Sequence, residues 1–276
     1  MIREITSYES CRDFVRDFQK DPRYADPMLK TPEQLRRNLL LPITRPENHC
    51  CFAVYRNGKM TGLFSVLALR QERYLEMLAG LCREREGYRE AMDYLRQTFP
   101  GWGADFVFSP QNDLLRAQLR EAGAFFDPEQ QKMVFSGTAP DMDTEGIVSW
   151  DGRFAGQYAA IHSRDLYWTA EKVMQAPDRF RTFLAVRDGQ VVGYLDVTYC
   201  YTPNEPYDLL VLEPYRRMGY GKKLLKRALE ENGDRGMMLL VETDNLPAVR
   251  LYAAMGFRKA EGENSQTAHW QIPECP

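Results

Sequence analysis

Apolar residues recur at helical spacing in the first forty or so residues, and the pattern predicts two helices there. Apolar side chains at helical spacing fill residues 11–18 until Pro22 stops the pattern, and Thr6 with Glu9 reads as a capping box at its start. A second helix begins at Thr31, with Pro32 at its first position, and extends to about residue 42. Both helices are expected to be amphipathic.

The next segments alternate between strand and helix patterns. Residues 51–55 and 60–66 are rich in aromatic and branched side chains, and Asn57-Gly58 between them predicts a tight hairpin turn. Further strands are expected at residues 74–81, 105–108 and 125–135, with helices at about 88–99 and 112–121, the latter ended by Gly123.

The order of elements then begins again. Residues 52–62 resemble residues 183–193 with one slipped position, and residues 112–123 align without gaps on residues 245–256. The offsets agree with one another at about 131 to 133 residues, which indicates a duplicated domain. Because residues 136–144 are small, polar and turn-forming, we expect domains at 1–136 and 146–276 with a linker at 137–145.

Composition narrows the class of partner. With 36 basic and 39 acidic residues the net charge is -3, so neither nucleic acid nor an anionic membrane is expected to bind, and the partner is expected to be small. Six cysteines without a Cys-x-x-Cys spacing and only three histidines favour a reduced, cytoplasmic protein without a metal site. No signal pattern and no apolar run of about eighteen residues occurs, so we expect a soluble protein. Nothing in the composition predicts its oligomeric state.

One turn stands out in the second half. The apolar run of residues 209–212 leads through Pro214 into Arg216-x-x-Gly219-x-Gly221, which opens a helix. The first N–H groups of a helix lack intrahelical partners and attract anions, and glycines let a phosphate approach the main chain. The turn lacks the Gly-Lys-Ser/Thr of a triphosphate loop and the third glycine of a dinucleotide fingerprint, so neither of these loops is expected. Two glycines near a helix start are also common without a ligand, and the surrounding residues must decide between the two readings.

The first half lacks these features. Its corresponding residues, 83–88, contain one glycine and two acids, and Leu119 stands where the second half has Tyr252. Carboxylates repel phosphate, so we expect the first copy to have lost this ligand and to serve a structural or acceptor-shaping role.

The second half resembles the GNAT superfamily of acetyl-CoA-dependent N-acetyltransferases over residues 147–270. The resemblance rests on the Arg-x-x-Gly-x-Gly turn, on the hairpin with Gly189 and Gly193, and on Asn245-x-x-Ala248-x-x-x-Tyr252-x-x-x-Gly256-Phe257. It implies an α/β fold with two tandem GNAT-like domains, each a mixed, mostly antiparallel sheet flanked by helices. The pairing of a complete and a degenerate domain is similar to the architecture of mycothiol synthase-type proteins.

The family pattern assigns cofactor contacts to individual residues. Acetyl-CoA lies in the family where two parallel strands splay, which places it beside residues 207–212 here. The resemblance implies that Val211 N–H polarises the thioester carbonyl and that Asn245 contacts the cofactor arm. The residues expected around the acyl-CoA and its pyrophosphate are Val211, Leu212, Arg216, Arg217, Met218, Gly219, Tyr220, Gly221, Lys222 and Asn245.

Two residues are candidates for proton transfer. Tyr252 matches the family tyrosine that protonates the departing thiolate, and packing beneath the hairpin is its alternative role. Glu205 is the expected base, because regular strand alternation places it on the face of Val211, although it could also be a solvated loop carboxylate. Asp196 and Glu242 are the alternatives for the base.

The remaining polar and thiol residues carry weaker signals. The helical region that usually walls the acceptor pocket contains His162, Arg164, Asp165, Tyr167 and Trp168. The thiols of Cys50, Cys51 and Cys200 are expected to be packing residues, since no histidine pattern beyond His49 supports a nucleophile.

The predicted function is therefore acetyl transfer from acetyl-CoA to a primary amine by direct attack, on an acceptor that the sequence does not identify. A non-catalytic protein that binds an acyl-CoA or a protein partner is the alternative.

Overall fold

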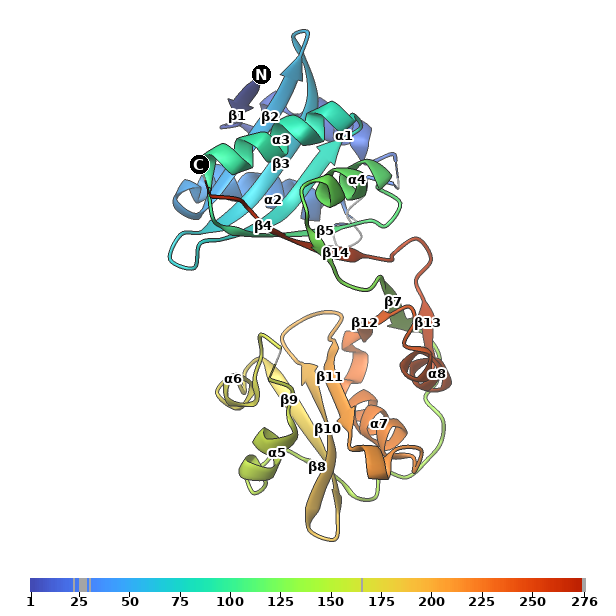
Figure 1. The fold of residues 1–276 in the computed structure, drawn as a ribbon. Coiled ribbons are helices and arrows are strands. Elements are labelled where there is room, and N and C mark those ends of the chain that lie inside the picture. Colours follow the sequence, from blue (N-terminus) through green and yellow to red (C-terminus); the bar gives the residue numbers. More distant parts are fainter. Residues whose placement is uncertain (22, 25–28, 30, 165, 275–276) are drawn as a thin grey trace. The chain divides into compact units, whose positions relative to one another are not determined.

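The computed structural model describes residues 1–21, 23–24, 29, 31–164 and 166–274, and the chain forms two compact units (Figure 1). Unit 1 comprises Met1–Gln130 and Glu261–Pro276, and unit 2 comprises Gln131–Ala260. These limits revise the expected domains at 1–136 and 146–276. The hydrophobic pattern identifies a strand, but it does not say which sheet the strand joins.

Unit 1 is built on one mixed, mostly antiparallel sheet with helices on both faces. The β4 and β5 strands are parallel, and the other neighbours for which a register is known are antiparallel. In spatial order the strands are β1 (Ile2–Glu4), β2 (His49–Arg56), β3 (Lys59–Leu69), β4 (Tyr74–Cys82), β5 (Gly103–Phe108), β14 (Gln266–Gln271) and β6 (Phe125–Phe126).

Two hydrophobic cores lie on the opposite faces of this sheet. One contains side chains of α1 (Arg12–Phe18) and α2 (Pro32–Thr44), and the other contains those of α3 (Arg85–Thr98) and α4 (Asp113–Glu121). The short 3-10 turn η1 (Tyr8–Ser10) precedes α1, and η2 (Pro46–Asn48) lies between α2 and β2.

The start of α2 follows the sequence prediction. The Thr31 hydroxyl accepts from Gln34 N at 3.2 Å, and the Gln34 side chain accepts from Thr31 N at 3.0 Å, which completes a capping box. The predicted Thr6 and Glu9 box is wrong, because η1 intervenes and α1 starts after Cys11 with no side-chain cap.

The predicted hairpin turns are confirmed in both units. Asn57 and Gly58 have φ values of 50° and 76°, and Asp188 and Gly189 have 51° and 77°. Two consecutive residues with positive φ match the twist of antiparallel strands, which explains the Asn-Gly and Asp-Gly pairs.

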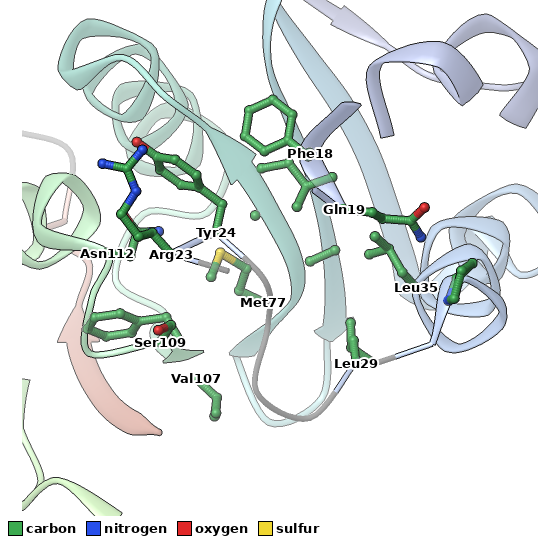
Figure 2. Close-up of a pocket in the computed structure, with 15 residues that line it drawn as sticks. Phe18, Gln19, Arg23, Tyr24, Leu29, Leu35, Met77, Val107, Ser109 and Asn112 are labelled. Carbon is green, nitrogen blue, oxygen red and sulfur yellow. The ribbon is translucent and has the colours of Figure 1, made fainter. Parts of the chain in front are cut away.

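A pocket of about 140 Å³ lies where β4 and β5 part. Their parallel register ends at Met77 and Phe106, and the pocket lies beyond it. Figure 2 shows mostly apolar walls, with Met77, Val107 and Leu35 among them and Ser109 and Asn112 at one side. In unit 1, strands β4 and β5 are therefore paired at one end and separate at the other.

Unit 2 contains two sheets and the remaining helices. One sheet has the order β11 (Pro206–Val211), β10 (Gln190–Thr198), β9 (Phe180–Arg187), β8 (Ile147–Ser149), and the other has β12 (Met238–Glu242), β7 (Gln130–Phe135), β13 (Phe257–Lys259). The helices are α5 (Ala155–Ile161), α6 (Ala170–Met174), α7 (Tyr220–Asn232) and α8 (Leu246–Ala254), with 3-10 turns η3 (Glu213–Tyr215) and η4 (Gly233–Arg235). The mixed α/β fold expected from the sequence is confirmed.

The two sheets of unit 2 meet at one point and then diverge. Asn204 and Met237 form a single parallel bridge, in which Met238 N donates to Asn204 O at 2.9 Å. Buried Asn204 is fixed there, because its Nδ2 donates to Asn232 Oδ1 at 2.8 Å. Beyond the bridge, β11 pairs with β10 and β12 pairs with β7, and the two strands are not paired with each other; we call this unpaired interval between β11 and β12 the wedge.

Two strands pair in the unit other than the one that precedes them in the sequence. Strand β7 follows unit 1 in sequence but pairs with β13 in unit 2, and β14 follows unit 2 but pairs with β5 and β6 in unit 1. On β14, His269 Nδ1 donates to Asp105 at 2.7 Å and Nε2 donates to Asp127 at 2.9 Å. Since both ring nitrogens face carboxylates, the charged imidazolium fits this position.

The hydrogen bonds of His269 to Asp105 and Asp127 should make a pH-dependent contribution to the stability of the fold. Burial lowers the pKa of His269, but its hydrogen bonds to Asp127 and Asp105 outweigh burial and raise the pKa above its ordinary value. A group with a raised pKa stabilises the fold fully below its unfolded value, near 6.5, and less as pH rises through the folded value. His269→Gln should therefore lower the melting temperature by ~1–3 °C at pH 6 and by less at pH 9, measured by calorimetry.

The matched control is Gln271→Ala on the same strand, whose amide donates to Gly101 O at 3.2 Å and does not titrate. Its effect should be equal at both pH values. If the loss of melting temperature in His269→Gln is larger at pH 9 than at pH 6, the charged imidazolium is not the stabilising form of His269.

No helix in the described part of the chain is both long enough and apolar enough to cross a bilayer.

Candidate active site

The turn before α7 has the geometry of an anion site. Gly219 is the N-cap of α7 with φ of 91°, and Arg217 also has a positive φ of 63°. The first i to i−4 bond of the helix runs from Lys223 N to Gly219 O, so the preceding amides at residues 220–222 have no intrahelical acceptor. No side chain caps them, and they can hold a phosphate.

Basic side chains surround this turn. Arg217 and Lys222 are exposed and belong to none of the ion pairs found among the described residues. The nearby Lys223 forms an ion pair with Asp143 instead. Arg187 was not predicted; its guanidinium lies 3.8 Å from Met218 Sδ, which brings a further cation from the β9–β10 hairpin to the turn.

The register of β11 points the peptide groups of Val211 into the wedge. Leu212 N donates to Val192 O at 2.9 Å, so Val211 opposite Gly193 is a non-hydrogen-bonded pair whose N–H and C=O point away from β10. The Val211 carbonyl accepts from Arg216 Nε at 3.0 Å. Its N–H is free to face a ligand in the wedge.

A β-bulge interrupts β11, so the regular alternation expected from Glu205 to Val211 is wrong. Asp196 pairs with Asp208, but Val197 pairs with Pro206, which leaves Tyr207 as an extra residue. Because of this extra residue, regular alternation along the strand no longer tells whether Glu205 and Val211 lie on the same face. A bulge depends on pairing with β10, which the local pattern of β11 does not reveal.

Glu205 nevertheless lies at the apex of the wedge, next to the Asn204–Met237 bridge. Burial raises the pKa of its carboxyl to about 7, and the positive charge of Lys132 offsets part of that effect. A carboxyl group with this pKa can accept a proton near neutral pH. Lys132 comes from β7, about seventy residues earlier in the chain, and no local signal identifies it.

Tyr252 lies on α8 and is half-buried, with its ring 5.9 Å from that of Phe257. Burial, followed by the charge of Asp208, raises the pKa of Tyr252 to about 12, so the phenol stays protonated at neutral pH. The Asn245 side chain caps α8, because its Oδ1 accepts from Ala248 N at 3.2 Å. Asn112 caps α4 in the same way in unit 1.

A buried polar cluster adjoins β11 on the face that carries α5 and α6. The Asp196 carboxylate accepts from Thr182, from Tyr158 at 2.8 Å and from His162 Nε2 at 3.0 Å, and the Tyr194 hydroxyl donates to Asp208. The His162 ring stacks on Tyr194 with centroids 4.9 Å apart. The cluster consists of Tyr158, His162, Thr182, Tyr194, Asp196 and Asp208.

The pKa values of His162 and Asp208 are both raised. Burial lowers the pKa of His162, but its bonds to Asp196 and Ser163 O and the charges of Asp196 and Asp208 leave it raised. Burial raises the pKa of Asp208, although the Tyr194 hydroxyl opposes this. Only His162 and Asp196 of this cluster were singled out from the sequence, because the others come from separate strands and a helix.

Several weaker sequence candidates lie apart from these contacts. Tyr167 is exposed, Trp168 packs edge-on against Phe180 at 5.1 Å, and Asp165 lies outside the described residues. Glu242 is exposed at the end of β12, and Asp196 is fully enclosed by the polar cluster, so neither matches the position of Glu205. Cys51 is buried and Cys50 half-buried on β2 of unit 1, and burial raises the pKa of each thiol to about 12, which disfavours the reactive thiolate.

The corresponding turn of unit 1 is built differently. Helix α3 follows Glu84, which has no side-chain cap, and Glu86 lies in its first turn. Tyr88, which corresponds to Gly221, is 1% exposed and its hydroxyl accepts from Asn112 Nδ2 at 2.8 Å. A buried phenol and two carboxylates occupy the region where unit 2 has glycines and open amides.

Part of the chain is similar to known proteins. Residues 147–257 match the family model Acetyltransferase (GNAT) family. The mycothiol acetyltransferase of Thermomonospora curvata is 34% identical over 116 residues, which cover 39% of this chain and 39% of that protein. The aligned part thus spans about two fifths of the relative's length.

Solved structures extend the likeness to the whole fold. The GCN5-related N-acetyltransferase from Sphaerobacter thermophilus has a TM-score of 0.58 at 16% identity, over 83% of this chain and 82% of that one. A tandem GNAT protein from the clavulanic acid biosynthesis pathway has a TM-score of 0.55 at 14% identity and covers 100% of both chains. Residues 147–257 are therefore similar to the acetyltransferase (GNAT) family, and the fold of the chain is similar to that of a tandem GNAT protein.

Proposed function

We propose that unit 2 transfers an acetyl group from acetyl-CoA to a primary amine by direct attack. The observation that carries the proposal is the uncapped start of α7, which follows β11 in the chain, while Glu205 precedes β11 next to the bridge at the end of the wedge. The family match supports an acyltransferase, and the anion site fits a pyrophosphate.

Each residue of the site has a role in this reaction. The amides of residues 220–222, with Arg217 and Lys222, hold the pyrophosphate, and Arg187 adds positive charge. Acetyl-CoA supplies the activated thioester carbonyl, and Val211 N–H is oriented to donate to the negative charge that develops on its oxygen. Met218, Tyr220 and Leu212 shape the same turn.

Proton transfers complete the reaction. The acceptor amine forms a bond to the acetyl carbon while the carbon–sulfur bond breaks, and Glu205 takes the proton that the amine loses. Tyr252 gives its proton to the leaving thiolate, which departs as CoA. Asn245 positions Tyr252 by starting α8, and its Nδ2 remains available to the cofactor arm.

We assign unit 1 a structural or acceptor-shaping role without the cofactor loop. The support is the replacement of Gly221 by buried Tyr88 and the acids Glu84 and Glu86. The near balance of charge and the unpatterned cysteines support a small-molecule or peptide amine as acceptor and a cytoplasmic location, with neither nucleic acid nor membrane as a partner.

The proposal is tested by incubating the full chain with acetyl-CoA and a panel of amines, polyamines, aminoglycosides and peptides, and measuring free CoA. We expect CoA release that depends on at least one amine and equals the acetylated product in amount. Binding of acetyl-CoA in calorimetry with no release for any amine would instead establish a non-catalytic acyl-CoA-binding protein.

Tyr252→Phe should lower turnover by roughly tenfold to several thousandfold while acetyl-CoA affinity changes little. The ring and its contact with Phe257 remain, so only the proton donor is lost. Steady-state kinetics and calorimetry on the same preparation check this. Unchanged turnover would assign Tyr252 a packing role.

A further inference from the structure

The main chain of Asn204 and Glu205 connects the two sheets of unit 2. Asn204 N donates to Gly236 O at 3.2 Å, and Asn204 O accepts from Met238 N at 2.9 Å, so both main-chain groups of Asn204 are bonded on the β12 side. Glu205 is bonded to β10 instead, because its carbonyl accepts from Thr198 N at 2.8 Å. These two consecutive residues are therefore tied to different sheets.

One bond between Glu205 and β10 uses a side chain. Two residues that form a hydrogen-bonded pair in an antiparallel sheet normally exchange both N–H···O bonds through the main chain. Here the Glu205 N–H donates to the Thr198 hydroxyl at 2.7 Å in place of the second main-chain bond. Pro206 follows and has no N–H, so it cannot donate to β10 in place of Glu205. Thr198 is 4% exposed, so water has little access to this bond, and a side chain without an oxygen atom cannot make it.

The residue before Glu205 is fixed by a second set of side-chain bonds. Asn204 is fully buried; its Nδ2 donates to Asn232 Oδ1 at 2.8 Å, and its Oδ1 accepts from Tyr201 N at 3.0 Å. Asn232 Nδ2 donates in turn to Gly236 O at 2.8 Å. Asn204 cannot shift without breaking several of these bonds, so the β12 side of the connection is held at more than one point.

The position of the Glu205 carboxyl matters for the rate, because this group is the proposed base. A general base has to come within about 2.6–3.2 Å of the proton-bearing atom, and a displacement of ~1 Å can cost about a hundredfold in rate. Burial raises the pKa of the carboxyl to about 7, and the positive charge of Lys132 on β7 opposes that effect. Both the reach and the burial of the carboxyl depend on where the main chain is held.

We propose that Thr198 is a positioning residue, whose hydroxyl holds the Glu205 main chain so that the carboxyl stays buried at the end of the wedge. This inference rests on the proposed function, because Thr198 acts through the proposed base. Thr198 needs no contact with either substrate for this role.

A titration of the Glu205 carboxyl tests the proposal without any acceptor. In ¹³C NMR spectra of the full chain labelled at its glutamate carboxyls, the Glu205 signal is the one that disappears in Glu205→Gln. We expect its midpoint at about pH 7 in the original protein and in Thr198→Ser, which keeps the hydroxyl. In Thr198→Val the main chain is released and water reaches the carboxyl, so the midpoint should move down toward 4.5, the ordinary value.

Ser65→Ala is the matched control for the loss of a buried hydroxyl. Ser65 is 0% exposed on β3 of unit 1, and its Oγ donates to Asn38 O at 2.8 Å. This variant should leave the Glu205 midpoint and kcat/KM unchanged, even where its melting temperature falls.

Kinetics then test whether the hydroxyl acts through Glu205. With an amine that supports CoA release, Thr198→Val should lower kcat/KM by about ten- to a hundredfold while acetyl-CoA affinity is unchanged, and Thr198→Ser should stay close to the original protein. In a Glu205→Gln background Thr198→Val should change kcat/KM by at most about twofold, because the group that it positions has already been removed. Thr198→Ala removes the hydroxyl without placing a methyl group against the Glu205 N–H, and it serves the same comparisons should the valine variant unfold.

The outcomes separate this inference from the proposed function. No CoA release with any amine overturns the proposed function, whereas an unmoved Glu205 midpoint in folded Thr198→Val overturns the positioning role whether or not CoA is released. The role is also overturned if Thr198→Val lowers kcat/KM by the same factor with and without Glu205. A loss of acetyl-CoA affinity as large as the loss of kcat/KM would assign the hydroxyl to the cofactor site and overturn it too.

Discussion

Gly219→Glu should weaken acetyl-CoA binding by at least a hundredfold. The new carboxylate would stand at the N-terminus of α7, where the open amides of residues 220–222 attract the pyrophosphate, and it would both repel and displace that group. No protein atom lies within 4 Å of an added Cβ at this position, so the fold should persist despite the φ of 91°. Calorimetric titration with acetyl-CoA measures the effect.

Two further variants separate charge from backbone strain. Gly233→Glu places the same side chain at the other end of α7, again at a positive φ and with no atom within 4 Å, and should leave affinity close to that of the original protein. Gly219→Asn tolerates the left-handed conformation without adding charge and should retain most of the affinity. Undiminished binding in Gly219→Glu would refute the phosphate assignment.

Glu205→Gln should reduce kcat/KM by about 10² to 10⁴-fold, the usual scale for the loss of a general base. Because burial raises the pKa of Glu205 to about 7, activity of the original protein should increase with pH up to that value as the carboxylate forms, and then level off. The rising limb should disappear in Glu205→Gln. A pH profile of kcat/KM from about pH 5.5 to 9 provides the measurement.

Lys132 supplies an independent check on the same group. Its positive charge lowers the pKa of Glu205, so Lys132→Met should move the rising limb to higher pH without abolishing it. If Glu205→Gln keeps the limb and Glu242→Gln loses it, the base is Glu242 instead.

The candidate site was predictable in its contiguous part. The turn at residues 216–221 and the α8 segment from Asn245 to Tyr252 are short motifs whose geometry is set by neighbouring residues, such as a glycine that can adopt a positive φ. The sequence did not predict that Asn245 caps α8, because helix capping and a cofactor contact can use the same residue type.

Residues that meet across strands were not predictable in this way. The bulge at Tyr207 arises from pairing with β10, and it changes which side chains share a face with Glu205. Lys132, Tyr158, Thr182 and Tyr194 are ordinary strand or helix residues until the sheet brings them to the wedge or to the polar cluster.

The domain limits show the same distinction on a larger scale. The sequence repeat identified two copies of one fold, because the spacing of hairpin and helix motifs survives duplication. Strand β7 joins a sheet of unit 2 and strand β14 joins the sheet of unit 1, so the domain limits depend on which sheet each strand joins. Strand periodicity is identical for either edge, so the pattern could not decide it.

By itself, the sequence determined the type of fold, its duplication and the presence, in the second copy only, of the glycine-containing turn that we propose binds an anion. These properties follow from local backbone preferences and from the order of elements along the chain. The tertiary structure decided the bridge at Asn204, the burial that raises the pKa of Glu205, and the buried polar cluster around His162 and Asp196. Burial and charge pairing depend on neighbours distant in sequence, and only the folded chain brings these together.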